Sequence, residues 1–309
     1  MFDVAIIGAG ASGLTCAINA SFEGLSTVMV EKGGIGGQAA TTSKIENYPG
    51  FPQGIDGQKL MSQFYMQAER LGTHSIVANV TGFKKESDTL FTLVTENDTL
   101  PIVARSVVFA TGLSFRRLHL PGSDNMRGLY YGPSVHQAPS EYLKNVAVLG
   151  AANSAGQAAI NLAKYASSVY VINKKPSLDQ VMSSTLIKDI ATLKNVQVIN
   201  KCNLATITGK DNKLHFITLD NGQELPVSAL FVCIGQLADT SWLQGSGIDI
   251  SSTVGNFGKI IVDENLLTSI PGVFAIGDVR NNQVHRVSTA VGDGSRVVQH
   301  ILDYLKGKS

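Results

Sequence analysis

The first residues with clear chemical meaning are Gly8, Gly10 and Gly13, which fall at G-x-G-x-x-G spacing. They come directly after a short apolar run and directly before a segment whose apolar positions recur at helical spacing. Glu31 ends the next apolar run, about 20 residues after the second glycine. This order of strand, glycine turn, helix and acid predicts a dinucleotide site. In such a site the turn and the helix N-terminus face the pyrophosphate, and the acid accepts ribose hydroxyls.

The same pattern returns in the middle of the chain. The apolar run 146–149 ends at Gly150, and a second run, 170–172, ends at Asn173, which occupies the place of Glu31. The separation between the first glycine and the last residue of the unit is equal in both copies. The chain therefore contains two Rossmann-like units, one inserted into the sequence of the other.

The second copy differs at two positions that bear on its ligand. Ala152 replaces the middle glycine and adds a Cβ where phosphate oxygens would lie, and Asn173 replaces the acid. Lys174 and Lys175 follow directly, and losing the acid while gaining cations favours the 2′-phosphate of NADPH over NADH. The alternative is a solvated lysine turn in a unit that binds nothing. The candidate NADPH residues are Gly150, Asn153, Ser154, Ala155, Lys174 and Lys175.

Composition narrows the class of protein. The chain has 309 residues, of which 44% are hydrophobic and 16% charged, with a net charge of +1. This length allows two domains, and the charge gives no reason to expect nucleic acid or an anionic membrane as a partner. No apolar run approaches the ~20 residues of a membrane span, and the first strand starts too early for a signal peptide. Cys16, Cys202 and Cys233 form no C-x-x-C, metal or disulfide pattern, so we expect a cytoplasmic protein without a metal site.

The remaining periodicity predicts the elements that position these two units. Residues 57–71 have helical spacing, residues 74–112 alternate like a small antiparallel layer, and a final helix runs from about residue 294 to 305. Buried strands are expected at residues 107–112, 229–235 and 271–278. The predicted fold class is α/β, with two three-layer (ββα/βα) Rossmann-like dinucleotide-binding domains, the second inserted into the first.

Four more segments carry glycine-containing motifs: Gly-Gly-Gln at 36–38, Ile-Glu-Asn-Tyr-Pro-Gly at 45–50, Ala-Thr-Gly at 110–112, and the run 268–278 that ends in Gly-Asp. Together they resemble the FAD motifs of the low-molecular-weight thioredoxin reductases, over essentially the whole chain. The resemblance implies a homodimer with FAD in the first unit. It also implies that Asp278 bonds the flavin ribitol and that the backbone from Arg286 to Ser288 meets the flavin pyrimidine edge. The FAD residues so assigned are Gly8, Gly10, Ser12, Gly13, Glu31, Lys32, Gly37, Gln38, Asn47, Thr111, Gly112, Gly277, Asp278, Arg286, Val287 and Ser288.

One departure from this family bears directly on the reaction. Its reductases carry C-x-x-C just before the second unit, whereas residues 130–139 here contain no cysteine. Counting back from Gly150 aligns Pro133 and His136 with the two cysteines of that motif, and an alignment shifted by one residue is the alternative. A dithiol reacts through its thiolate, which proline and histidine cannot replace, so we do not expect ordinary thioredoxin reduction. The chain resembles a thioredoxin-reductase-like branch that also lacks C-x-x-C.

His136 is the candidate catalytic residue. We expect it near the flavin in place of a thiol, where an imidazole could move protons close to neutral pH. The alternative is a loop histidine with a structural hydrogen bond.

The family resemblance also sets the expected domains and function. The FAD-binding domain spans residues 1–117 and 245–309, and the NAD(P)H-binding-type domain spans residues 118–244. The expected function is FAD-dependent transfer of electrons between NADPH and a non-disulfide acceptor such as a quinone, a ferredoxin or a small molecule. The alternatives are a ferredoxin-linked enzyme, an atypical disulfide reductase that uses Cys16, and a non-catalytic FAD redox sensor.

Overall fold

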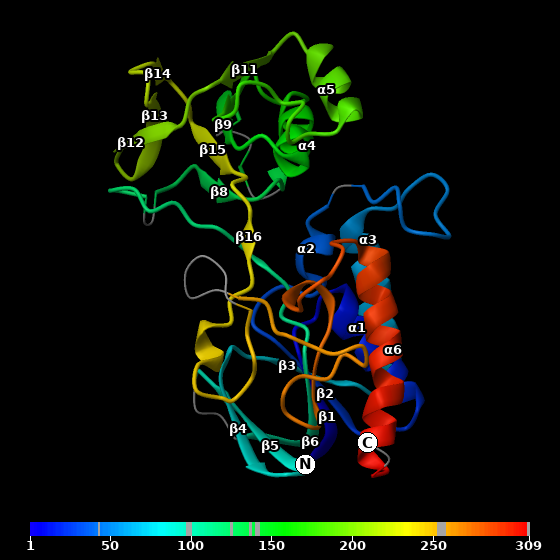
Figure 1. Cartoon of the computed structure of the whole chain (residues 1–309). Helices are drawn as coiled ribbons and strands as arrows, with labels where there is room; N and C mark the ends of the chain where they lie inside the picture. The colour runs from blue at the N-terminus through cyan, green and yellow to red at the C-terminus, as the bar shows by residue number, and fades with distance from the viewer. Residues whose placement is uncertain are drawn as a thin grey trace. The chain divides into compact units, whose positions relative to one another are not determined.

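The structure is a computed structural model that describes most of the chain. Described are residues 1–42, 44–96, 101–123, 126–135, 138–139, 143–251 and 258–307. The predicted catalytic residue His136 lies outside the described residues. The chain divides into two compact units, and both are visible in Figure 1: unit 1 is Met1–Ser114 with Leu237–Ser309, and unit 2 is Phe115–Gln236.

Two short strands connect the units. They are β7 (Ser114–Phe115) and β16 (Gln236–Leu237), and they pair with each other as a two-stranded sheet. The division between the units falls inside these strands. The family resemblance placed the domain boundaries at residues 117 and 245, slightly later along the chain at both crossings.

Unit 1 is built on one seven-stranded sheet. Its strands are β1 (Phe2–Ile7), β2 (Thr27–Glu31), β3 (His74–Val77), β4 (Val80–Ser87), β5 (Leu90–Thr95), β6 (Ile102–Phe109) and β17 (Val273–Ala275). Its helices are α1 (Ala11–Phe22), α2 (Gly37–Ala40), α3 (Gly57–Arg70) and α6 (Val287–Leu305), with 3-10 turns η3 (Ser241–Leu243) and η4 (Gly277–Val279). The strand order is β3-β2-β1-β6-β5-β4, and β17 pairs with the second half of β6.

The predicted antiparallel layer over residues 74–112 is wrong for its first strand. β3 lies parallel to β2 and extends the Rossmann sheet. β4, β5 and the first half of β6 are antiparallel, as predicted, and β6 also lies parallel to β1. Alternation along a short strand does not say which neighbour it will pair with, so the sequence could not separate these two arrangements.

The C-terminal helix begins earlier than its periodicity predicts. α6 starts at Val287, whereas the sequence placed its start near residue 294. The residues between include valine, threonine and glycine, which have low helix propensity. Tertiary contacts override that propensity here, because Ala290 and Asp293 are buried and Asp293 Oδ2 accepts a hydrogen bond from the Gly277 N–H at 3.0 Å.

Unit 2 repeats the Rossmann pattern on a smaller scale. Its strands are β8 (Leu129–Tyr131), β9 (Asn145–Leu149), β10 (Ser168–Asn173), β11 (Val196–Asn200), β12 (Leu204–Lys210), β13 (Lys213–Leu219), β14 (Glu224–Leu225) and β15 (Ala229–Val232). Its helices are α4 (Asn153–Leu162) and α5 (Ser184–Ala191). The five-stranded parallel sheet has the order β11-β10-β9-β15-β8, and β12-β13-β14 form a separate three-stranded sheet.

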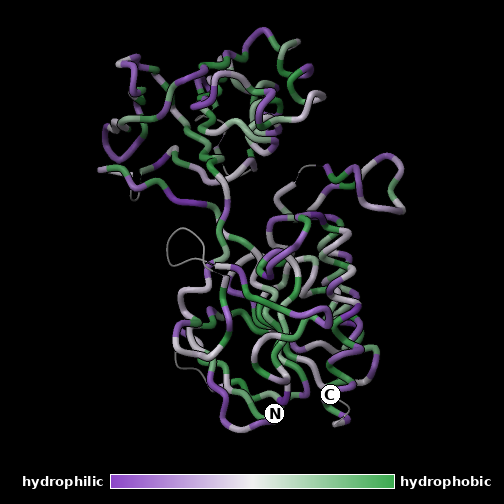
Figure 2. Tube along the Cα trace, viewed as in Figure 1, coloured by the Kyte–Doolittle hydropathy of each residue, from purple (hydrophilic) through white to green (hydrophobic). Residues whose placement is uncertain are grey.

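The central parallel strands of both units are buried on two faces, as continuous apolar strands predict. In β1, Val4 and Ile6 belong to the core shared with α1 and α6, while Ala5 and Ile7 belong to the core on the opposite face. β9 alternates in the same way between the cores on the two faces of the unit 2 sheet. The hydrophobic strands in the interior of unit 1 stand out in Figure 2. No described helix is both long and apolar enough to cross a membrane.

Candidate functional site

The turn between β1 and α1 requires glycine at two positions and leaves open space at a third. Gly8 has φ +106°, and a Cβ there would lie 2.4 Å from the Ala110 carbonyl oxygen. A Cβ on Gly13 would lie 2.0 Å from the Gly8 carbonyl oxygen. A Cβ on Gly10 would meet no other protein atom within 4 Å, and Gly10 caps α1 without a side-chain hydrogen bond. The open space and the free N–H groups of the first helical turn suit a pyrophosphate.

Glu31 lies directly beside this turn. Its Oε2 accepts a hydrogen bond from the Ala9 N–H at 2.8 Å, and its Oε1 accepts one from the Gly33 N–H at 2.9 Å. A carboxylate has more acceptor sites than these two bonds use. The side chain is therefore held in position while it can still accept ribose hydroxyls. The neighbouring Lys32 is exposed.

Further predicted FAD residues reach the turn from distant parts of the sequence. A Cβ on Gly37 would lie 3.3 Å from Gly10 Cα. Gln38 Nε2 donates to the Leu113 carbonyl oxygen at 2.6 Å, which ties this segment to the loop at residues 111–112. The structure therefore brings these predicted residues next to the glycine turn.

The start of η4 also lies against α1, whereas one predicted residue stands apart. A Cβ on Gly277 would lie 2.5 Å from Ser12 Oγ, so these two predicted residues are neighbours. Asn47 lies exposed on the turn that the Ile45–Ile55 bridge closes, and no contact described here joins it to the cluster. Its role in FAD binding stays a prediction.

Asp278 carries a buried acceptor that lacks a donor. Among the described residues, Asp278 Oδ1 is the buried side-chain atom that no protein group satisfies. Burial raises the pKa of this carboxyl, and the nearby charges of His285 and Lys259 oppose the shift. An unsatisfied buried acceptor is costly, and a ligand hydroxyl would satisfy it. Together with the open space at Gly10, this observation fits FAD with its ribitol at Asp278.

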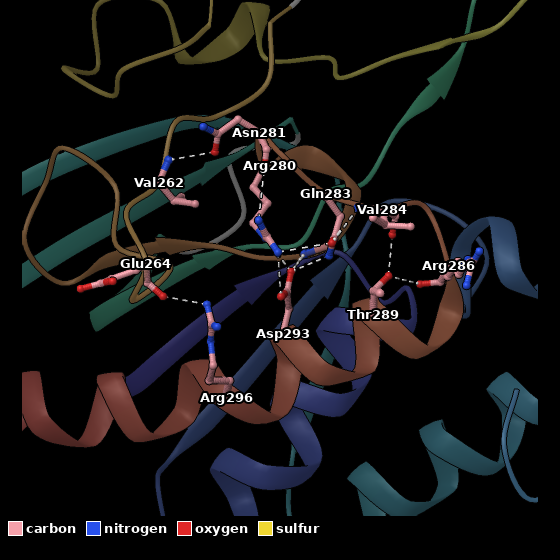
Figure 3. A network of polar contacts seen from close by, with 11 residues as sticks. Val262, Glu264, Arg280, Asn281, Gln283, Val284, Arg286, Thr289, Asp293 and Arg296 are labelled. Carbon is pink, nitrogen blue, oxygen red and sulfur yellow. Dashed lines mark hydrogen bonds and ion pairs between the residues drawn. The ribbon is translucent and has the colours of Figure 1, made fainter.

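A buried ion pair holds the segment between η4 and α6 (Figure 3). Asp293 Oδ2 accepts hydrogen bonds from Arg280 Nε at 2.7 Å, Gln283 Nε2 at 2.7 Å and the Gly277 N–H at 3.0 Å. Its Oδ1 accepts one from Arg280 Nη2 at 3.0 Å. The side chains of Arg280 and Asp293 are only 15% and 9% exposed. One carboxylate on α6 thus fixes the segment that begins at η4.

The N-terminus of α6 provides the last predicted FAD contacts. Arg286 is its N-cap residue and makes no side-chain cap bond. Val287 and Ser288 form the first turn, whose N–H groups have no partner within the helix. These groups and the positive end of the helix dipole can stabilise negative charge on a bound group.

The glycine turn of unit 2 has the same backbone geometry as that of unit 1. Gly150 has φ +129°, and a Cβ there would lie 2.2 Å from the Cys233 carbonyl oxygen. Its N–H donates to the Ile172 carbonyl oxygen at 3.1 Å, as the Gly8 N–H donates to that of Val30 at 2.8 Å. The repeat read from the sequence is therefore a structural repeat.

The start of α4 offers fewer free groups to a ligand. Ala152 is the N-cap residue and is exposed. Asn153 Oδ1 accepts a hydrogen bond from the Ser183 N–H at 2.8 Å. The Ala155 side chain is fully buried, and its N–H donates to the Ala152 carbonyl oxygen at 2.9 Å. Ser154 is the predicted residue of this turn that can still offer a side-chain group to a ligand. Its side chain is half-exposed, and none of the hydrogen bonds described for this part of the chain uses its hydroxyl.

Asn173 is a structural residue, although it occupies the place of the ribose-binding acid. It is fully buried, its Nδ2 donates to Asn200 Oδ1 at 2.8 Å, and its Oδ1 accepts from the Lys175 N–H at 2.9 Å. Lys174 and Lys175 are exposed. The Lys201 N–H donates to the Lys175 carbonyl oxygen at 3.1 Å. Lys201 thus adds a third cation, which sequence reasoning missed because it follows a different strand.

The three cysteines lie in three different hydrophobic cores. Cys16 is a fully buried residue of α1, and Cys202 and Cys233 lie in the two cores on opposite faces of the unit 2 sheet. All three are free thiols. Burial raises the pKa of the Cys16 thiol well above its ordinary value and that of Cys233 to about 12. Cys16 is therefore a core residue, which argues against the disulfide reductase that would use it.

A cavity of about 250 Å³ opens in unit 1 beside Glu31. Its lining comes from the ends of β1 and β2, the turn before β4, the loop after β6 and the residues around η3. Thr111 and Lys32 are among the predicted residues that line it, and Trp242 is a lining residue that sequence reasoning missed. Trp242 belongs to no motif, so only the folded chain reveals its position.

Comparison with known proteins agrees with this geometry. Residues 2–294 match the family described as pyridine nucleotide-disulphide oxidoreductase. The chain is 33% identical over 306 residues to the thioredoxin reductase of Mycoplasmopsis pulmonis, covering 96% of this chain and 94% of the relative. Its fold is similar to that of Lactococcus lactis thioredoxin reductase, with a TM-score of 0.89, 28% identity and coverage of 99% and 100% of the two chains. For the T. acidophilum thioredoxin reductase the TM-score is 0.84 at 28% identity, covering 100% of this chain and 99% of that chain.

Thioredoxin reductases use FAD and NADPH. The family match spans nearly the whole chain, and the site residues described above lie at the ends of the strands where this fold binds its nucleotides. The chain therefore belongs to the pyridine nucleotide-disulphide oxidoreductase family and is an FAD-dependent oxidoreductase of the thioredoxin-reductase-like type.

Proposed function

We propose that this protein uses FAD to move electrons between NADPH and an acceptor that is not a disulfide. The observation that carries the proposal is the arrangement of its thiols. The chain has three cysteines, none in the segment 130–139, and each lies buried in a separate core. Exchange with a disulfide substrate requires an accessible thiolate. A quinone, a ferredoxin or another small redox molecule needs no such group.

FAD, when bound, supplies the redox chemistry, and the residues of unit 1 would hold and orient it. Gly10 and the N-terminus of α1 would face the pyrophosphate, and Glu31 would accept ribose hydroxyls. Asp278 Oδ1 would gain the donor that the protein does not supply. The N-terminus of α6, from Arg286 onward, would stabilise negative charge at the pyrimidine edge.

For NADPH, we propose the lysines at the ends of β10 and β11. Asn173 does not select the nucleotide because its amide is satisfied inside unit 2. Lys174 and Lys175 are exposed, and the backbone bond from Lys201 to Lys175 brings a third lysine to the same edge of the sheet. Three cations at this edge, with Asn173 in the place of the ribose-binding acid, suit a 2′-phosphate better than a ribose diol.

Two further parts of the proposal rest on sequence and family. We propose His136 as the residue that moves protons, because it stands where the family has a redox cysteine. We also propose that the protein is a homodimer, as thioredoxin reductase homologues typically are. Light scattering of the purified protein measures the second point directly.

A second candidate function takes its support from unit 2. Ala152 adds a Cβ at the phosphate turn, and the Ala155 N–H is already bonded within the chain. If these features close the turn to a nucleotide, the electrons of the flavin come from a protein donor such as ferredoxin. If neither a nucleotide nor a protein electron donor supports turnover, the alternative is a non-catalytic FAD redox sensor.

The test is an anaerobic titration of the purified holoenzyme with NADPH and then NADH, following flavin absorbance. We expect bleaching by NADPH at far lower concentration than by NADH. Lys201→Gln should weaken the response to NADPH about tenfold and leave the response to NADH unchanged, because it removes one phosphate contact of a few kcal/mol at most. Lys188→Gln, on α5, is the matched control and should change neither.

Reduction by dithionite but by neither nucleotide would exclude the NADPH proposal and favour the second candidate. If NADPH does reduce the flavin, turnover with NADPH as donor is compared between two acceptors, a quinone and a disulfide such as oxidised thioredoxin. Faster turnover with the disulfide would contradict the non-disulfide acceptor.

A further inference from the structure

The cavity beside Glu31 has the size of one part of a dinucleotide. Its volume of about 250 Å³ lies below the roughly 300–1,000 Å³ of sites that enclose a whole drug-sized ligand. Gly8 and Glu31 line it, so it continues from the glycine turn toward the ribose-binding acid. Other lining residues include Asn79, Asp239 and Trp242, which come from outside the glycine turn. The cavity therefore suits the nucleoside at the adenosine end of FAD.

Trp242 is held rigidly at this cavity. Its indole Nε1 donates to the Asp239 carbonyl oxygen at 3.1 Å. Its ring packs on Phe109, with centroids 5.7 Å apart and planes tilted by 59°. Phe109 is fully buried at the end of β6, and Leu243, next to Trp242 in η3, is buried as well. An aromatic ring fixed in this way loses little conformational entropy when a ligand binds against it.

The remaining surface of the indole can offer only its π-face and edge. The N–H is the single polar group of tryptophan, and the protein already satisfies it. A hydrogen-bonding role toward a ligand is therefore closed, whereas contact with a flat aromatic ring is open. Adenine is such a ring, and Glu31 in the same cavity would hold the ribose attached to it.

We infer that Trp242 is a nucleoside-binding residue whose indole forms the aromatic wall for the adenine of FAD. The inference rests on the proposed FAD site in unit 1 and adds to it a residue outside every motif of the sequence. Its consequence is that the adenosine half of FAD contributes binding that FMN, which lacks this half, cannot provide.

The first test uses the wild-type chain, because Trp242 is its single tryptophan. All tryptophan emission therefore reports on this cavity. We expect ADP to change the emission of full-length apoprotein in a saturable manner, and FAD to displace ADP, whereas FMN at the same concentration does not. ADP absorbs no tryptophan emission, so a change is not an absorption artefact, and its reversal by FAD assigns it to the FAD site. An emission spectrum that ADP leaves unchanged overturns the inference.

The second test uses variants of the holoenzyme, with FAD release followed by the recovery of flavin fluorescence on dilution. Trp242→Leu keeps an apolar side chain against Phe109 and should lower FAD affinity about 5- to 100-fold, the effect of removing an aromatic side chain that stacks on a base. Trp242→Phe should stay within about threefold of the wild type because it keeps an aromatic wall. Tyr165→Leu, an exposed aromatic residue of unit 2 at 66%, is the matched control and should change nothing.

The outcomes separate this inference from the proposed function. If the wild-type protein binds no FAD, the proposed function fails. If it binds FAD and Trp242→Leu binds it equally well, only the role of Trp242 fails. If Trp242→Leu does not fold, Trp242→Phe and the ADP titration decide. A loss of FAD affinity in Trp242→Phe as large as the loss expected for Trp242→Leu would contradict an aromatic wall.

Discussion

The ion pair between Asp293 and Arg280 provides the sharpest test of how α6 positions the flavin site. Asp293→Asn keeps the size of the side chain but removes its charge. Arg280 then remains as a nearly buried cation, 15% exposed, without a counter-ion. The amide also presents a donor where Arg280, Gln283 and Gly277 all donate. The substitution therefore breaks several bonds at once without creating a large cavity.

The magnitude follows from the burial of the pair. Removing one partner of a buried ion pair costs about 3–5 kcal/mol, because the other charge is left uncompensated. Replacing both partners by apolar residues of similar size is often close to neutral. We therefore expect Asp293→Asn to lose about 3–5 kcal/mol of unfolding free energy, and the double variant Arg280→Met/Asp293→Leu to lose much less than the sum of its single variants. The coupling should exceed about 2 kcal/mol.

The assay is denaturant unfolding of the holoprotein, followed by flavin fluorescence and by circular dichroism. In Asp293→Asn, flavin release should precede the loss of secondary structure, because the segment that carries Asp278 is released first. The control is Asp88→Asn, which breaks the exposed pair with Lys85, outside every predicted FAD motif, and should have no measurable effect. A loss below about 1 kcal/mol in Asp293→Asn, or additive single variants, would refute the argument that the pair positions the site.

Two further predictions concern the glycine turn and Asp278. Gly10→Ala should fold normally, since its Cβ meets no other protein atom, yet lose FAD, because that Cβ occupies the space that suits the pyrophosphate. Gly13→Ala should unfold, because its Cβ would lie 2.0 Å from a backbone oxygen. Circular dichroism reports the folding of each variant, and flavin absorbance reports its bound FAD. Asp278→Asn should weaken FAD binding but stabilise the apoprotein against heat at neutral pH. Burial raises the pKa of this carboxyl, so wild-type stability falls as the pH rises from about 4 through the raised pKa, and the gain should vanish at acidic pH.

Local patterns were sufficient to predict much of the fold. The two β-α-β units were confirmed, because a glycine turn between a buried strand and a helix has a distinctive sequence. The pairing of β3 and the start of α6 were not predictable in the same way. Both depend on contacts with residues far away in the sequence, which alternation and helix propensity do not record.

The site was predictable where a motif marks it and unpredictable where the fold alone assembles it. Glu31 lies beside the glycine turn because its strand is the neighbour of β1, which the β-α-β pattern already implies. Trp242 lines the cavity of unit 1 from η3, and Lys201 lies beside Lys175 directly after β11, and neither carries a signal in its own sequence. At Asn173 the sequence indicated only that the ribose-binding acid is missing, and the structure adds that its amide is bonded inside unit 2.

The two glycine turns separate what folding requires from what a ligand requires. Gly8 and Gly150 both have positive φ, and a Cβ on either would collide with a carbonyl oxygen, so the backbone demands glycine in both units. Gly10 is different, because the protein leaves its Cβ position empty, and at the equivalent place unit 2 accepts Ala152. The fold therefore does not require glycine at residue 10, and the absence of a side chain there indicates room for a phosphate. The turn of unit 1 therefore combines the fold of a dinucleotide site with space for a phosphate, whereas the turn of unit 2 keeps the same backbone with a side chain in that space.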